Sequence, residues 1–162
     1  MASLDTIPSI YWIQLAWLDP LISFGTMLQA LFAPDMLFAI YLPRHLVAAV
    51  PFPPLYRPLL HQVGAWYLFH TIVSGATPRV TRDRNVWKML QVAMLAIDSC
   101  LLWDFYGIVA EQGRADPRAW KMGELAGVAY VACVWVLRLS FVVGVGLSRR
   151  TVTSDGGVKK QA

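Results

Sequence analysis

The sequence predicts an all-α protein, a four-helix transmembrane bundle, and three observations predict this class. Hydrophobic residues make up 57% of the 162 residues and charged residues only 15%, whereas soluble domains carry about 25% charged residues. The mean hydropathy is +0.49. Four apolar stretches each reach the ~20 residues that a helix needs to cross ~30 Å of hydrocarbon. Helices are the default spans because lipid offers the backbone no hydrogen bonds.

The four expected spans cover about residues 10–33, 58–76, 86–110 and 122–147. They form one membrane domain over residues 1–147, and a flexible polar tail follows at 148–162. Between the first two spans, residues 34–58 contain six prolines around a short apolar run. This segment is too interrupted to span, so we expect a Pro-rich interfacial segment with a short helix. The first apolar run lacks basic residues before it and a small-residue cleavage site after it, which indicates a retained helix.

The net charge is +4, but the basic residues lie in short clusters between apolar stretches. This pattern is typical of membrane flanks and does not favour nucleic-acid binding. Four crossings place both termini on one side, and the excess of basic residues on that side favours cytosolic termini. The terminal side holds Arg79, Arg82, Arg84, Lys88, Arg149, Arg150, Lys159 and Lys160, and the opposite side holds Arg44, Arg57, Arg114, Arg118 and Lys121.

The sequence contains no metal or cofactor motif. Cys100 and Cys133 fall inside apolar segments, and we expect them to be buried free thiols. There is no CxxC, zinc-ligand spacing or disulfide framework, and no phosphate loop, nucleophile elbow or dinucleotide fingerprint. We therefore expect neither a metal nor a cofactor. The serines inside the spans have no catalytic context, since helical serine usually bonds its own backbone.

Each expected span carries an ionisable residue at bilayer depth, where a charge costs ~2.5–3.5 kcal/mol or more. The four are Asp19, His70, Asp98 and Arg138. At ~1.5 Å of rise per residue from the cytosolic ends, they lie at depths of roughly 14, 11, 18 and 12 Å, within a layer about 7 Å thick. A second, deeper layer holds His61, Asp104 and Glu124.

Arg138 is the most constrained of these residues, because its guanidinium stays protonated and needs a carboxylate or a wet cavity. Asp19 and Asp98 are nearest in depth. Two interpretations stay open: a buried ion pair that only holds the bundle together, and a polar pocket lined by the same groups. His70 likewise suits either an interhelical hydrogen bond or a site. Asp98 and Asp104 are six residues apart, about 120° around the helix, and are treated as separate sites.

Two local patterns bear on how the helices pack. Pro20 has no N–H, so the Ala16 carbonyl loses its usual partner and the helix is expected to kink there. Gly123 and Gly127 form a GxxxG pattern, which allows close helix approach, and packing within the bundle is favoured over dimerisation.

Four tryptophans lie away from the helix ends. They suit either core packing or the wall of an apolar substrate site, where their π faces would stabilise a developing cation. The candidate substrate-binding residues are Trp17, Trp66, Trp103, Trp135 and Asp104.

Short motifs follow one another in a recognisable order over residues 7–146. They are Ile7-Pro8-Ser9-Ile10-Tyr11, Asp19-Pro20, Phe32-Ala33-Pro34, Arg84-Asn85-Val86-Trp87, Ile97-Asp98 and Leu137-Arg138. This order resembles a family of small four-span integral membrane proteins of filamentous fungi, whose relatives occur in polyketide and terpenoid secondary-metabolite pathways. It is similar to the membrane epoxide hydrolases of polyene-polyether biosynthesis and, more loosely, to the larger transmembrane terpene cyclases. The family often has Glu before the proline where this chain has Asp19.

The resemblance implies a cofactor-independent epoxide hydrolase or epoxide-opening cyclase of the endoplasmic reticulum membrane, acting on an apolar small molecule. Opening an epoxide needs an acid for the departing oxygen and a base for water or an internal hydroxyl. Two carboxyls in different environments can divide these roles. We expect Asp98, near Arg138, as the base, Asp19 as the acid, and His70 to orient the water or hydroxyl. The reverse assignment of the two carboxyls stays open.

Other functions also fit the sequence. The alternatives are a non-catalytic lipid- or sterol-binding or accessory membrane protein and a terpene-cyclase-like isomerase. A transporter is less favoured, because the chain lacks an inverted repeat. The expected partners are the lipid bilayer and an apolar small molecule, and a homo-oligomer is compatible with the sequence.

Overall fold

The computed structural model describes residues 7–42, 52–81 and 83–147. All regular structure in these residues is helical, in agreement with the predicted class. The expected tail at 148–162 and residues 43–51 of the Pro-rich segment lie outside the described residues.

The first long helix runs unbroken over Ser9–Phe32. It consists of α1 (Ser9–Ile13), the π-helical turn η2 (Gln14–Leu18) and α2 (Asp19–Phe32). The remaining elements are α3 (Pro34–Tyr41), the 3-10 turn η3 (Pro54–Tyr56), α5 (Arg57–Val80), α6 (Arg84–Glu111), the 3-10 turn η4 (Pro117–Ala119) and α7 (Met122–Val143). Prolines open several of them, since the first helical position needs no N–H.

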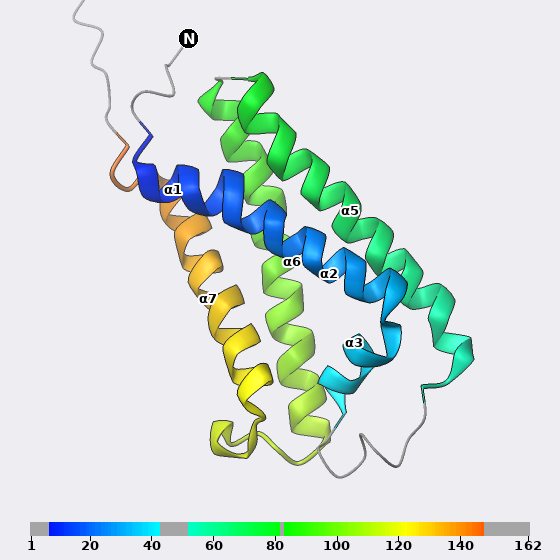
Figure 1. Cartoon of the computed structure of the whole chain (residues 1–162). Helices are drawn as coiled ribbons and strands as arrows, with labels where there is room; N and C mark the ends of the chain where they lie inside the picture. The colour runs from blue at the N-terminus through cyan, green and yellow to red at the C-terminus, as the bar shows by residue number, and fades with distance from the viewer. Residues whose placement is uncertain (1–6, 43–51, 82, 148–162) are drawn as a thin grey trace, which may run out of the picture.

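The long helices pack as two pairs, α2 along α5 and α6 along α7 (Figure 1). The pairs are joined at one end by a hydrophobic core cluster from η2, α1, α6 and α7. Its members are Tyr11, Leu15, Ala16, Trp87, Phe141 and Leu147. Tyr11 also donates to the Val145 carbonyl at 3.0 Å. The two ends of the described chain, Ile7 and Leu147, therefore meet at this end of the bundle.

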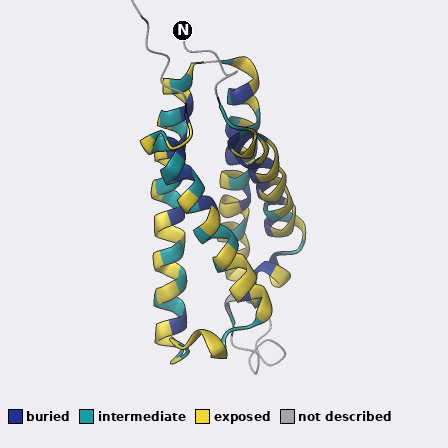
Figure 2. Ribbon diagram, turned by 90° about the vertical axis from the view of Figure 1, so that its left-hand side faces the viewer, coloured by how far each residue is buried: buried dark blue, intermediate teal, exposed yellow. Residues whose placement is uncertain are grey.

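Three helices are long and apolar enough to cross a membrane: Ser9–Phe32, Arg84–Glu111 and Met122–Val143. Exposed residues run along every long helix (Figure 2), and large hydrophobic side chains are among them. These features indicate a membrane protein. The sequence predicted four spans. The 24-residue α5 is long enough, but it is less apolar because it carries His61, Gln62, His70 and Arg79.

Just before Pro20, where the sequence predicted a kink, the structure has the π-helical turn η2, a distortion that often marks functional sites. The Ala16 carbonyl, deprived of the Pro20 N–H, accepts a hydrogen bond from Arg79 Nη1 of α5 at 3.1 Å. The same guanidinium lies over the Trp17 ring, 4.3 Å from its centroid. The Arg79 side chain thus supplies the hydrogen-bond donor that the Pro20 backbone lacks.

Two predictions about packing are wrong. Among the described residues, nothing lies within 4 Å of where a Cβ would stand at Gly123 or Gly127, so no described helix packs closely against the GxxxG pattern. Close approach occurs instead at Gly64 of α5, where a Cβ would lie 2.9 Å from Leu31 Cδ2. Cys100 and Cys133 are exposed, not buried. Both lie on outward faces, and an outward face in a membrane is apolar as well.

Candidate functional site

Arg138 of α7 lies between two carboxyl groups in the middle of the bundle. Its Nη2 donates to Asp19 Oδ2 of α2 at 2.7 Å. Its Nε is 3.1 Å from Asp98 Oδ2 of α6, which is an ion-pair distance without the alignment of a hydrogen bond. The arginine is only 1% exposed. One guanidinium thus bridges helices α2, α6 and α7.

A second chain of contacts leads from Asp19 to α5. His70 Nε2 is 3.3 Å from Asp19 Oδ2, and His70 Nδ1 is 2.9 Å from Ser23 Oγ. Ser23, His70 and Asp19 are all buried. Sequence reasoning missed Ser23, although it lies four residues after Asp19 and therefore on the same face of the helix.

Tyr130 and Gln14 were also missed. Gln14 Nε2 donates to Tyr130 Oη at 3.1 Å, which joins η2 to α7. Tyr130 lies eight residues before Arg138, with the buried Val134 between them, so a stripe at intervals of four residues was the available signal.

All of these groups except Gln14 border a cavity of about 230 Å³ between the four long helices, which we call the polar cavity. All four ionisable residues of the predicted first layer line it, and most of its remaining wall is apolar. Its polar lining residues include Asp19, Ser23, Thr26, Tyr67, His70, Asp98, Tyr130 and Arg138. Drug-sized ligands usually occupy pockets of about 300–1,000 Å³, so this cavity alone holds a small group or part of a larger molecule.

The candidate substrate-binding residues separate in the structure. Trp66 lines the polar cavity. Trp17 lies on the outer side of α2 and η2 beside Arg79. Trp103 is 75% exposed, and Trp135 donates to Ser99 Oγ at 2.9 Å. None of these last three lines the polar cavity.

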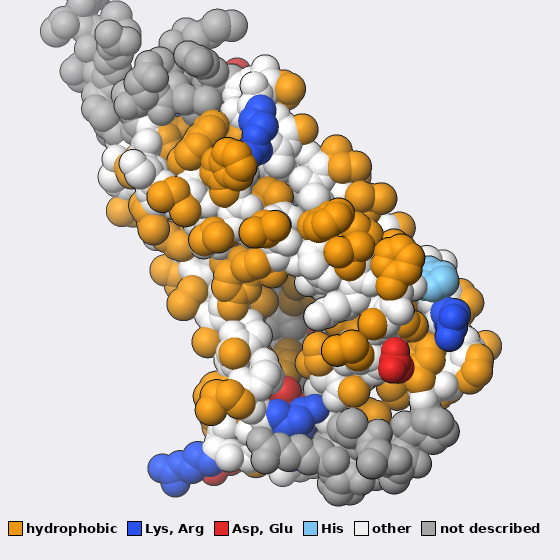
Figure 3. Space-filling model, in the orientation of Figure 1, with side chains coloured by type: hydrophobic (Ala, Val, Ile, Leu, Met, Phe, Trp, Pro, Cys, Tyr) orange, Lys and Arg blue, Asp and Glu red, His pale blue; other side chains and the backbone are white. Residues whose placement is uncertain are grey.

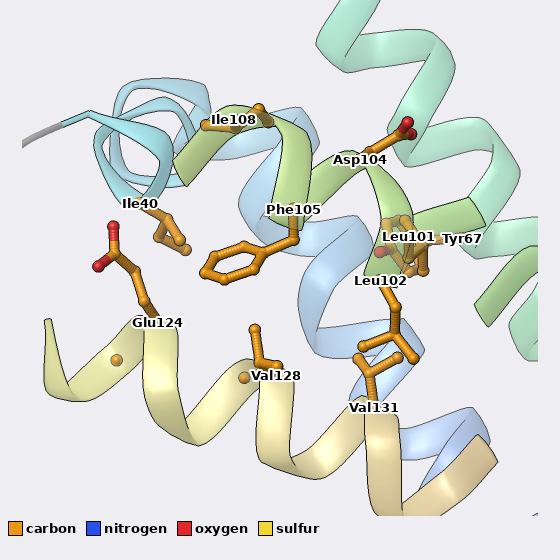
Figure 4. Close-up of a pocket in the computed structure, with 12 residues that line it drawn as sticks. Ile40, Tyr67, Leu101, Leu102, Asp104, Phe105, Ile108, Glu124, Val128 and Val131 are labelled. Atoms are coloured by element: carbon orange, nitrogen blue, oxygen red, sulfur yellow. The ribbon is translucent and has the colours of Figure 1, made fainter. Parts of the chain in front are cut away.

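A second cavity of about 390 Å³, here the apolar cavity, adjoins the polar cavity. The two share the lining residues Tyr67, Leu101, Gly127 and Val131. Figure 4 shows Phe105 of α6 and Val128 of α7 pointing toward each other across it, while the Asp104 carboxylate extends away from both.

The predicted deeper layer does not form one cluster. His61 and Asp104 are exposed, and only Glu124 is buried. Glu124 accepts two hydrogen bonds from Arg114, at 2.9 and 3.0 Å, and one from the Lys121 backbone N–H at 2.6 Å. Its carboxylate is therefore satisfied by Arg114, from the segment between α6 and η4, and by Lys121, just before α7. Among residues 7–42, 52–81 and 83–147, no group of three or more His, Cys, Asp or Glu side chains is arranged to hold a metal ion.

The apolar helices and the enclosed ionisable cluster together define a small helical membrane protein with a polar site inside its bundle. The chain belongs to the DUF7704 family, a domain of unknown function, which matches residues 3–148. No curated protein and no solved structure matches it.

Proposed function

We propose that the protein is a cofactor-independent membrane enzyme that opens an epoxide in an apolar small molecule, as an epoxide hydrolase or an epoxide-opening cyclase. The observation that carries the acid–base chemistry is Arg138, held between Asp19 and Asp98 beside His70 at the wall of a cavity. The epoxide as the reacting group rests on the resemblance of the sequence motifs to those of fungal membrane epoxide hydrolases.

The charges of the cluster support the proposal that one of its two carboxyl groups is protonated. When His70 is neutral, two carboxylates against one guanidinium leave an uncompensated negative charge in a buried site, which is costly. A proton on one of the carboxyls removes this charge. The cluster can therefore hold one proton that is available for transfer and one carboxylate that is available to accept a proton.

The contacts favour Asp19 as the base and Asp98 as the acid. This is the reverse of the assignment expected from the sequence, which left this alternative open. Asp19 accepts the aligned 2.7 Å bond from Arg138, and hydrogen bonds from a guanidinium are strongest when they are made to a carboxylate. Asp98 has only the unaligned 3.1 Å contact. In the proposed reaction, the Asp98 proton passes to the epoxide oxygen as the C–O bond breaks. The attacking water or internal hydroxyl forms the new C–O bond to that carbon and gives its proton to Asp19, and this proton returns to Asp98 before the next turnover.

Two further groups support this reaction. Arg138 Nη1 is buried without a hydrogen-bond partner among the described residues, so it is a donor available to the developing alkoxide. His70, fixed between Ser23 and Asp19, is placed to orient the attacking oxygen.

We further propose α5 as the fourth crossing. Its polar residues His70 and Ser74 are buried toward the bundle, while Phe69 and Ile72 are exposed, which is the pattern expected of a helix between protein and lipid. Four crossings place both termini on one side, and the distribution of Lys and Arg favours the cytosolic side of the endoplasmic reticulum membrane. Protease protection of tags at both termini in sealed microsomes tests this topology, because a protected tag would contradict it.

The catalytic proposal is tested with Asp19→Asn and Asp98→Asn, separately, in purified protein reconstituted in lipid vesicles with a panel of apolar epoxides. Loss of a general acid or base is expected to lower turnover by about 10²–10⁴-fold. Asp35→Asn, an exposed carboxyl in the first turn of α3, is the matched control and is expected to retain turnover. Full turnover in both test variants would contradict the proposal.

The non-catalytic alternative predicts a different pattern. If the ion pair only holds the bundle together, Asp19→Arg combined with Arg138→Asp is expected to restore abundance and every function together. An acid–base site would regain folded protein in this double variant without regaining turnover.

A further inference from the structure

The polar and apolar cavities adjoin each other, because four residues line both. Leu101 of α6 and Gly127 and Val131 of α7 lie at this junction, together with Tyr67 of α5. The polar cavity contains the ionisable groups, and the apolar cavity extends from it toward the start of α7. Figure 3 shows that this face of the molecule is largely hydrophobic and is hollowed between α7 and α3.

The apolar cavity offers hydrocarbon contacts and almost no free polar group. Its wall contains Leu102, Phe105, Ile108 and Val128. Of its two carboxylates, Asp104 is exposed and extends away from the centre (Figure 4), and Glu124 is satisfied by Arg114 and Lys121. An occupant of this space is therefore apolar along its length.

The far end of the apolar cavity is bounded by a clamp between α3 and α7. Lys121 Nζ donates to the carbonyls of Ala39, Ile40 and Leu42 at 2.9, 2.9 and 2.6 Å. Ile40, one of these residues, lines the cavity. The two cavities consequently have a reactive end, at Arg138, and a far end, at α3.

Two glycines keep the apolar cavity open. Gly123 and Gly127 line it, and no atom of the described part of the chain lies within 4 Å of the position of a Cβ at either residue. At 1.5 Å of rise per residue, Gly127 lies about 16 Å and Gly123 about 22 Å from Arg138 along α7. A side chain at either position would project into this space at a different distance from the ionisable cluster.

We propose that the apolar cavity holds the hydrocarbon chain of a substrate whose epoxide lies at or near one end of that chain. This inference rests on the proposed function for the reactive end. Gly123 and Gly127 then set the length of chain that fits, so that the substrate class is an elongated, unbranched or sparsely branched apolar epoxide.

The test is a chain-length series of terminal epoxides presented to Gly123→Leu and Gly127→Leu in lipid vesicles. For the longest substrate that wild type converts, kcat/KM is expected to fall by at least about tenfold, since hydrophobic pockets discriminate to this degree at the level of single methylenes. The shortest substrates should be unaffected in Gly123→Leu, and the preferred length should be shorter in Gly127→Leu than in Gly123→Leu. Gly107→Leu on α6, where a Cβ also meets nothing within 4 Å and which lines neither cavity, is the matched control and should keep the wild-type preference.

Failure of this inference is distinguishable from failure of the proposed function. If wild type turns over epoxides in an Asp98-dependent manner but the leucine variants keep the wild-type length preference, the chain site is wrong and the acid–base site stands. If no epoxide is turned over, binding of a radiolabelled long-chain epoxide decides: binding that Gly127→Leu abolishes and Asp98→Asn retains supports the chain site alone.

Two further outcomes complete the test. Conversion of a wild-type dimer to a monomer by Gly127→Leu would assign the space to a second copy of the chain and overturn the inference. Leucine has a higher helix propensity than glycine, so folded protein is expected. If a leucine variant is not recovered, the alanine variant at the same position carries the test, with a smaller shift in preferred length.

Discussion

Arg138→Met is the substitution that we expect to destabilise the buried cluster most. The guanidinium is 1% exposed and contacts Asp19 at 2.7 Å and Asp98 at 3.1 Å. At an effective dielectric constant of about 20, unit charges about 4 Å apart attract by about 4 kcal/mol. The variant loses this attraction to an ionised carboxylate, and protonation of the carboxyls limits the remaining cost. Breaking a buried ion pair by removing one partner typically costs about 3–5 kcal/mol, and we expect destabilisation of that size.

The assay is thermal unfolding of the purified protein in detergent. The abundance of the variant in membranes is a second, independent measurement. The triple variant Arg138→Met, Asp19→Asn and Asp98→Asn removes the orphaned charges and is expected to recover most of the lost stability. A single Arg138→Met variant within about 0.5 kcal/mol of wild type, the range of a neutral surface substitution, would refute the inference that this arginine neutralises a buried carboxylate.

Two further predictions concern the fold around the site. Lys121→Met removes three hydrogen bonds to carbonyls near the end of α3, each worth about 0.5–1.5 kcal/mol, and faster amide hydrogen exchange over Pro34–Tyr41 is expected. Unchanged exchange, as expected of the α6 control Lys88→Met, would count against the clamp. Gly64→Val places atoms against Leu31 at the contact of α2 with α5 and is expected to cost about 1–3 kcal/mol by overpacking, measured as a lower unfolding midpoint. Gly25→Val on α2 meets nothing within 4 Å and is the matched control, so equal midpoints for the two variants would contradict the close packing.

The ionisable layer was predictable because depth along a helix follows from residue number. A rise of about 1.5 Å per residue placed Asp19, His70, Asp98 and Arg138 near one level. The high cost of a charge in lipid then required them to face one another. The position of Ser23 was equally predictable, since its spacing of four residues from Asp19 places both on one face of the helix. However, burying a serine in a membrane helix costs much less free energy than burying a charge, so the sequence did not single it out.

Which face of an apolar helix meets protein was not predictable. Lipid and protein interiors are equally apolar, so the hydrophobic effect does not distinguish them between membrane helices. Cys100, Cys133 and Trp103 were therefore assigned to the interior although they face outward. For the same reason the Gly123–Gly127 pattern predicted helix packing, whereas the structure leaves a cavity there.

The sequence also could not predict which residue makes a long-range contact with the Ala16 carbonyl. Pro20 predicted an unpaired Ala16 carbonyl, but its donor, Arg79, lies 63 residues away on another helix. Arg79 had been counted only as a basic residue of the cytosolic flank. A tertiary contact thus decides whether the interrupted turn is a free kink or a stabilised π turn.

The protonation state of Asp98 in the resting protein tests the central claim most directly. Infrared spectroscopy of the protein in lipid at neutral pH, with Asp98→Asn and Asp104→Asn for comparison, reports protonated carboxyl groups through their carbonyl stretch. The account predicts a protonated-carboxyl band that Asp98→Asn removes and that Asp104→Asn, an exposed carboxyl on the same helix, retains. A spectrum without such a band, or a band that survives in Asp98→Asn, would contradict the assignment of Asp98 as the stored acid.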